Sequence, residues 1–138
     1  MTEKNSDLRV REDDLGADGD IVLYNGVPFT GIGYDLHPDG KLAHEVAYKD
    51  GFPDGVWREW YVSGQTKLES ECRKGLKHGR TTYWFPNGAV KSVANFELGI
   101  KLNGKEWNEA GNLVKEYEIL PGSPNYKLLE SFRTNEGD

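Results

Sequence analysis

The chain of 138 residues has almost no cysteine and no long apolar run. Its single cysteine, Cys72, excludes an intrachain disulfide framework. No apolar stretch approaches the roughly 20 residues that a membrane-spanning helix needs, and the first eight residues lack the apolar core of a secretory signal. These absences predict a soluble, cytoplasmic protein without membrane insertion.

Groups that carry catalysis or bind metals are scarce. The histidines stand apart from one another, and each fits a structural role in a turn or a strand: His37, His44 and His78. No pair has metal-ligand spacing, and Cys72 has no predicted histidine partner to lower its pKa. Residues 14–20 superficially resemble a calcium loop, but Gly16 and Asn25 occupy its third and twelfth positions. The sequence therefore predicts no catalytic residue, no metal and no cofactor, and favours a protein that is not an enzyme.

The net charge of −6 is concentrated near the amino terminus. Residues 1–20 hold three basic and seven acidic side chains, so they contribute −4, and residues 21–120 are close to neutral. We expect this acidic leader to be flexible or to add an irregular edge segment. The basic side chains of residues 73–80 belong to a solvated turn, and the acidic leader opposes a phosphate backbone, so no nucleic-acid partner is predicted.

Glycines recur along the chain with a period of about 24 residues. Three series are present: Gly31, Gly55, Gly79 and Gly104; Gly40, Gly64, Gly88 and Gly111; Gly51, Gly75, Gly99 and Gly122. The interval from the second series to the third is always 11 residues, whereas that from the first to the second is 9 and falls to 7 in the last unit. Such a period indicates stacked supersecondary units.

Each period predicts a β-hairpin. Aromatic and β-branched residues fill the runs, and Pro-Asp-Gly, Ser-Gly and Pro-Asn-Gly close them. We predict an all-β fold in which residues 21–120 form one elongated, twisted antiparallel sheet of stacked hairpins. A short capping helix should follow near residues 124–132, within a carboxyl segment of residues 121–138. It starts at Ser123 and Pro124, spaces Tyr126, Leu129 and Phe132 three apart, and should fray from residue 134 onward.

Two of these units carry a family resemblance. The segments Gly51–Gln65 and Gly75–Gly88 resemble the MORN-variant repeat, with its glycine turn followed by an aromatic strand. Residues 26–48 match it more loosely, and residues 99–118 are shortened. The repeat match implies the hairpin fold and is weak evidence for function. Small proteins built from such repeats are similar to bacterial antitoxin or immunity proteins, which implies a partner toxin.

The second strand of each unit alternates between an apolar and a charged face. We expect two apolar columns to form the core, Leu42/Thr66/Val90/Leu113 and Tyr48/Cys72/Phe96/Ile119. The opposite face carries an acidic row made of Glu45, Glu69, Glu71, Glu116 and Glu118. The first strands are aromatic on both sides: Trp57, Tyr61, Tyr83 and Phe85 point one way, Trp60 and Trp84 the other.

The leading hypothesis is a noncatalytic immunity protein that covers the active site of a cognate toxin enzyme. The expected contacts are aromatic anchors, with the acidic row complementing a basic substrate groove: Trp57, Trp60, Tyr61, Tyr83, Trp84 and Phe85. Alternatively, these aromatic side chains pack in the core and the glutamates form an ordinary solvated face. The second functional hypothesis is a scaffold for other proteins or a membrane surface. The oligomeric state stays open, and the outer strand of the first unit leaves an edge that could pair with itself.

Overall fold

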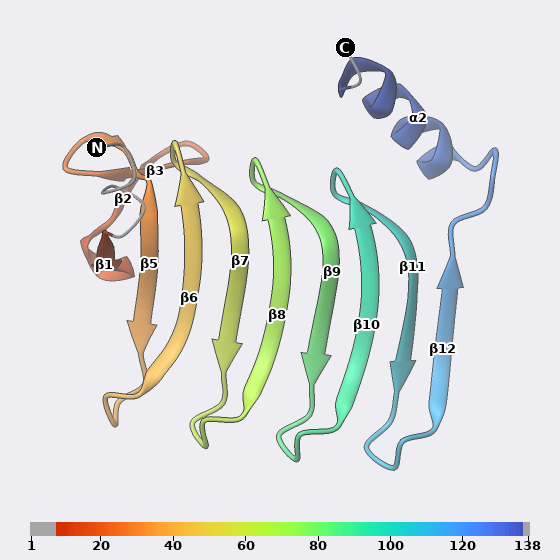
Figure 1. Ribbon diagram of the computed structural model, residues 1–138, viewed down its shortest axis with the longest axis horizontal. Coiled ribbons are helices and arrows are strands. Elements are labelled where there is room, and N and C mark those ends of the chain that lie inside the picture. Colours follow the sequence, from red (N-terminus) through yellow and green to blue (C-terminus); the bar gives the residue numbers. More distant parts are fainter. Residues whose placement is uncertain (1–7, 137–138) are drawn as a thin grey trace.

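The computed structural model describes residues 8–136 and contains one large, single-layered sheet (Figure 1). Nine strands follow the order β1-β5-β6-β7-β8-β9-β10-β11-β12; β1 pairs with β5 in parallel and the other neighbours are antiparallel. The strands are β1 (Arg9–Arg11), β5 (Gly31–Leu36), β6 (Leu42–Lys49), β7 (Phe52–Trp60), β8 (Thr66–Arg73), β9 (Leu76–Trp84), β10 (Val90–Glu97), β11 (Ile100–Trp107) and β12 (Leu113–Glu118). The predicted all-β fold of stacked hairpins is confirmed.

A second, three-stranded sheet covers the amino-terminal end. It consists of β2 (Gly16–Asp18), β3 (Ile21–Tyr24) and β4 (Val27–Pro28), preceded by the 3-10 helix η1 (Glu12–Asp14). Residues 21–28 therefore lie in the small sheet, and the hairpins of the main sheet start with β5 at residue 31, later than the predicted residue 21. Pro28 has no N–H to extend a ladder, and the next residue, Phe29, turns into the core and is 1% exposed. Of the leader, residues 8–20 form an irregular edge segment, and residues 1–7 lie outside the described part of the chain.

The helix α2 (Pro124–Glu136) covers the other end of the main sheet. The Ser123 Oγ accepts a hydrogen bond from the Tyr126 N–H at 3.2 Å, as expected of an N-cap residue. Leu129 is 1% exposed and packs with Ile100 and Ile119. The predicted helix is thus confirmed, but it continues through residues 134–136, where fraying was expected; residues 137–138 are not described.

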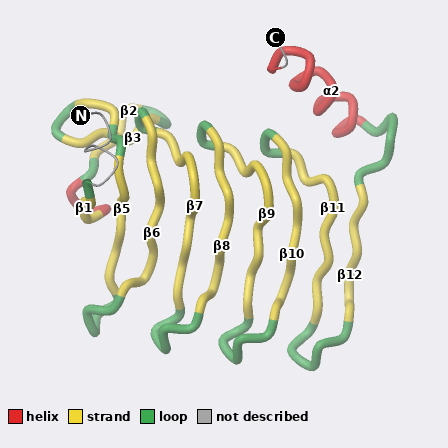
Figure 2. The backbone as a smooth tube through the Cα atoms, in the orientation of Figure 1, coloured by secondary structure: helices red, strands yellow, loops and turns green. Residues whose placement is uncertain are grey.

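Two kinds of turn alternate along the sheet (Figure 2). Tight turns such as Asp50-Gly51 and Lys74-Gly75 have positive φ at both central residues, which is the geometry of type I′ hairpins. At the opposite end, longer loops such as 61–65 place a glycine at positive φ, and the Gly64 N–H donates to the Tyr61 carbonyl at 2.8 Å. The glycine series therefore reflects backbone geometry that side chains oppose.

Gly104 does not belong to the series of Gly31, Gly55 and Gly79. Gly104 pairs with Ala94, and on the other side of β10 Ala94 pairs with Thr81. Gly79 instead pairs with Phe96. The position equivalent to Gly79 in the last unit is Leu102, whose carbonyl bonds the Ile119 N–H. The interval of 7 residues therefore compares glycines that are not equivalent. The last unit lacks only one residue, in the bulge between Lys101 and Gly104 that follows its tight turn.

The two faces of the main sheet differ in what covers them. One face carries Val46, Trp57, Ser70, Thr81 and Ala94, which oppose one another on successive strands. Both the small sheet and α2 pack on this side, so we call it the capped face. The opposite side, carrying Glu45, Arg58, Glu69, Thr82 and Val93, is left uncovered by both elements, and we call it the open face.

A β-bulge at the start of the second strand of each unit changes the predicted core. Leu42 pairs with Leu36 and His44 with Asp35, so the bulge transfers Leu42 to the open face. The equivalent bulges in the other units place Thr66, Val90 and Leu113 on the open face as well. The predicted core column Leu42/Thr66/Val90/Leu113 is therefore wrong, whereas the column of Tyr48, Cys72, Phe96 and Ile119 lies on the capped face, fully or half buried.

The described part of the chain holds no helix long and apolar enough to cross a membrane. The edge of β5, expected to be open for self-pairing, is occupied by β1. That expectation is wrong because the leader supplies a parallel strand.

Candidate interaction surface

A strip of apolar side chains crosses the open face at the end where the longer loops lie. It consists of four cross-strand pairs: Leu36 with Leu42, Trp60 with Thr66, Trp84 with Val90, and Trp107 with Leu113. The tryptophans are half buried, while Val90 and Leu113 are 38% and 48% exposed. We call these eight residues the tryptophan strip. Contiguous apolar side chains that stay partly exposed on a sheet are typical of an interaction site.

Trp107 is the tryptophan of the strip that the sequence hypothesis missed. The residues at positions 36, 60, 84 and 107 are spaced by 24, 24 and 23, which is the glycine period itself. Assigning Gly104 to the wrong series obscured this spacing in the last unit. The aliphatic partners of the tryptophans were missed for a different reason, since the bulge had placed them in the predicted core.

Side chains from the loops hold the strands of the strip together. The His37 Nε2–H donates to the Trp60 carbonyl at 2.9 Å, and the Tyr61 hydroxyl donates to the Trp84 carbonyl at 2.6 Å. Phe85 occupies the equivalent position in the next loop and has no polar atom to make such a bond. These two bonds tie the first unit to the second and the second to the third, so His37 and Tyr61 have structural roles beside the strip.

The acidic row lies entirely on the open face, but it is interleaved with basic side chains. The Arg58 Nε donates to Glu69 at 2.9 Å, Arg9 pairs with Glu45 at 2.7 Å, and Lys105 lies 3.8 Å from Glu116. Glu71 accepts the Arg80 N–H at 2.7 Å, while Glu118 lies beside Asn103 in the register. The row is therefore a ladder of alternating charges, not a uniformly acidic stripe.

Two shallow hollows line this ladder and share Arg80. The first, of about 430 Å³, is bounded by Val56, Arg58, Glu69, Glu71, Arg80 and Thr82. The second, of about 440 Å³, extends from Arg80 across Val93 and Asn95 to Trp107, Glu116 and Glu118. The second hollow thus adjoins the apolar strip at Trp107, and an apolar anchor beside a polar rim is the combination found at protein interfaces.

Trp57 and Tyr83 lie on the capped face, apart from the tryptophan strip. Trp57 packs against the amino-terminal core cluster of Val10, Phe29, Val46 and Tyr48, and its Nε1–H donates to Glu59 at 3.0 Å. Of the predicted aromatic anchors, Trp60 and Trp84 therefore lie on the same face as all five glutamates. It places Trp57 in the packing and Tyr61 and Phe85 in the loops.

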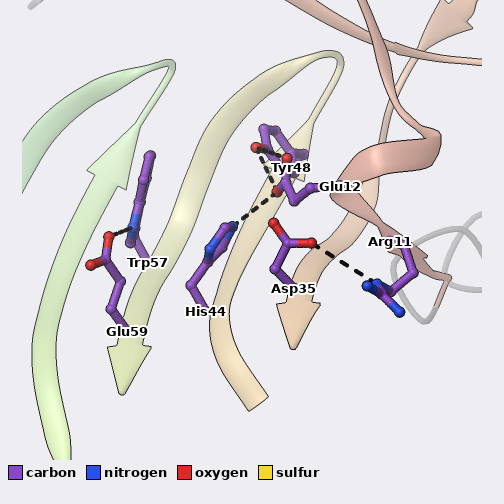
Figure 3. A network of polar contacts seen from close by, with 7 residues as sticks. All are labelled: Arg11, Glu12, Asp35, His44, Tyr48, Trp57 and Glu59. Atoms are coloured by element: carbon purple, nitrogen blue, oxygen red, sulfur yellow. Dashed lines mark hydrogen bonds and ion pairs between the residues drawn. The ribbon is translucent and has the colours of Figure 1, made fainter. Parts of the chain in front are cut away.

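A polar network on the capped face joins the leader to the repeats (Figure 3). The Tyr48 hydroxyl donates to Glu12 at 3.1 Å, and the His44 Nε2 lies 3.6 Å from the same carboxylate. Arg11 reaches Asp35 at 3.9 Å. Burial raises the pKa of the Tyr48 hydroxyl well above its usual range, and the negative charge and hydrogen bond of Glu12 raise it further. This network positions η1 and β1.

The remaining reactive groups are structurally engaged. The His78 Nδ1 accepts the N–H of Leu98 at 3.1 Å and so supports a tight turn. Cys72 is half buried, and burial raises the pKa of its thiol, which disfavours the reactive thiolate. Within residues 8–136, no cluster of three or more histidine, cysteine, aspartate or glutamate side chains has a geometry that would hold a metal ion.

Comparison with known proteins gives a family model and a curated relative. The model described as "MORN repeat variant" matches residues 77–97, which span β9 and β10. Immunity protein YwqK of Bacillus subtilis (strain 168) is 43% identical over 109 residues, which cover 79% of this chain and 71% of the relative. No solved structure matches the chain.

Proposed function

Because the chain belongs to the family of MORN-variant repeat proteins that includes immunity protein YwqK, we propose that it neutralises a cognate bacterial toxin by binding it directly. In this proposal it acts in the cytoplasm as a binding protein without catalytic activity. It covers the active site of the toxin enzyme and leaves the toxin chemically unchanged. The tryptophan strip on the open face is the observation that carries the proposal.

The strip suits this role because it is already formed before any partner arrives. Main-chain pairing fixes both strands of each unit, and His37 and Tyr61 join consecutive units through the carbonyls of Trp60 and Trp84. A partner that docks on a rigid surface loses little conformational entropy in the protein that presents it. Large aromatic side chains near the centre of an interface are typical energetic anchors.

The glutamates have a different place in the proposal. Glu45, Glu69 and Glu116 each lie beside a basic side chain, so their charge is partly neutralised within the protein. Partly exposed charges of this kind contribute to the rate of association and to specificity more than to affinity. We therefore assign the binding energy mainly to the tryptophans and expect the charged ladder to orient the toxin.

The test is co-expression of this protein with a candidate toxin, sought first in the neighbouring reading frames, followed by affinity measurement with the purified toxin domain. Trp60→Ala and Trp84→Ala should each weaken binding by about 2 kcal/mol or more, chiefly through faster dissociation. The matched control is Trp57→Ala on the capped face, which should lower the free energy of unfolding because Trp57 packs against the core cluster. Thermal unfolding identifies variants that lose binding only because they unfold.

Equal cell death with and without the protein would contradict the immunity function. Full affinity in the folded Trp60→Ala and Trp84→Ala variants would instead contradict the strip as the anchor. The scaffold hypothesis would gain support if the protein captured other partners while leaving the toxin active.

A further inference from the structure

Within residues 8–136, no strand pairs with the carboxyl-terminal edge of the main sheet. β12 is the last strand in the sheet order, and its outer side faces away from β11 in Figure 1. The connection to α2 leaves the strand at its end, so residues Leu113–Glu118 form an accessible edge about 20 Å long. Val114 is 60% exposed and Leu120, just beyond the strand, is 69% exposed.

The opposite edge shows how this protein protects a strand. There β1 pairs with β5, and the Arg9 and Arg11 guanidinium groups lie 4.9 and 5.9 Å from the ring centre of Tyr34. An added strand and flanking charges are recognised ways to block edge pairing. The β12 edge has no added strand in the described chain, although it carries Lys115 and a bulge near Val114.

We propose that the outer edge of β12 pairs with an extended strand of the toxin, one that carries basic side chains at alternate positions beside Glu116 and Glu118. This inference rests on the proposed immunity function and names a second contact for the same partner. Glu116 and Glu118 share the open face with the tryptophan strip and line the same hollow as Trp107. The strand would thus extend the binding surface without interruption.

The backbone geometry determines which amides are available. The Ile119 N–H donates to the Leu102 carbonyl, so Ile119 bonds toward β11. Because the direction of bonding alternates along a strand, Tyr117 and Lys115 bond toward β11 as well, while Glu118 and Glu116 direct their N–H and carbonyl groups outward. These outward groups are the ones that a partner strand would use.

Charge favours a toxin strand over a second copy of this chain. A two-fold symmetric antiparallel pair places its central residue opposite itself. Any such pairing centred on residues 115–118 sets Lys115 against Lys115 or glutamate against glutamate, and like charges directly opposite each other are destabilising. A basic strand instead meets Glu116, whose side chain is 61% exposed, and an apolar residue can occupy the hollow bounded by Tyr117, Leu120 and Pro124.

Amide hydrogen exchange of the intact protein, alone and saturated with the purified toxin domain, tests this inference. The Glu116 and Glu118 N–H groups should exchange rapidly in the free protein and slow by about tenfold or more in the complex. A toxin that fails to bind would overturn the immunity function together with this inference. Binding that leaves both amides unprotected would overturn the edge pairing alone, as would concentration-dependent protection in the isolated protein, which would indicate a second copy on the edge.

A pair of variants separates the backbone from the side chain. Glu116→Pro removes an outward N–H, a change that edge strands tolerate, and Glu116→Ala retains it. The proline variant should bind the toxin domain about tenfold more weakly than the alanine variant, which corresponds to one lost hydrogen bond. Equal affinities, with both variants folded by thermal unfolding, would refute the inference.

Discussion

Substitution of Gly79 by alanine should destabilise the protein through two separate effects. Gly79 has a φ of +114°, which side chains with a Cβ rarely adopt. An added Cβ would also approach the Glu71 carboxylate and lie 3.0 Å from its Cδ. That carboxylate accepts the Arg80 N–H at 2.7 Å, so its displacement would leave the bulge without this bond.

The expected loss is about 2 to 4 kcal/mol in the free energy of unfolding. Backbone strain contributes about 1 to 3 kcal/mol, and the displaced hydrogen bond contributes about 0.5 to 1.5 kcal/mol. Gly55→Ala should lose less, because Gly55 has the same kind of φ, +116°, but its added Cβ meets the Ala47 Cβ at 3.1 Å, without a bond to break. Urea unfolding of both variants measures the difference.

Gly16→Ala is the matched control, since Gly16 has no positive φ and nothing lies within 4 Å of its added Cβ. It should unfold at nearly the wild-type urea concentration. The reasoning would be refuted if Gly79→Ala were as stable as Gly16→Ala, or if Gly55→Ala lost more than Gly79→Ala.

Two further predictions concern side chains that support the backbone. His78→Ala should lower the free energy of unfolding by about 0.5 to 1.5 kcal/mol, because it removes the acceptor of the Leu98 N–H. His78→Asp should retain most of the stability, because Asp54 accepts the N–H of Lys74 in the preceding tight turn in the same way. Equal losses for the two variants in urea unfolding would contradict this role of His78. The pKa of the Tyr48 hydroxyl is raised in the folded state, so its contribution to stability is complete below the unfolded-state pKa of about 10. The free energy of unfolding should therefore decline as the pH rises above that value. Tyr48→Phe should flatten this alkaline decline, and an unchanged decline would contradict the burial of the Tyr48 hydroxyl beside Glu12.

The repeat pattern predicted the hairpins because each turn demands glycine at positive φ. Gly51, Gly75 and Gly99 occupy the tight turns, and Gly64 and Gly88 the longer loops. These demands are local, so they are visible in the sequence at a fixed period. The helix was predictable for the same reason, since its cap and its apolar spacing lie within a few residues.

The composition of the open face was not predictable from alternation alone. A bulge inserts one residue and changes which side chains share a face. Nothing in the sequence marks Ala43 as the inserted residue, so Leu42 was assigned to the core. Gly104 was assigned to the wrong series for a related reason. It is a glycine because a Cβ would make close contacts with Ala94 and Lys101, and the sequence alone does not distinguish a glycine required for packing from one required by a turn.

The repeats of the main sheet are not equivalent along its length. His37 and Tyr61 tie the first three units together, but Phe85 cannot bond the carbonyl of Trp107, so the last unit lacks this connection. The last unit also has the smaller bulge and presents the unpaired β12 edge. Identical stacked units would offer the same surface at every position along the sheet. The irregular last unit breaks that equivalence, and under the proposed function it would give a bound toxin a single position and direction on the open face.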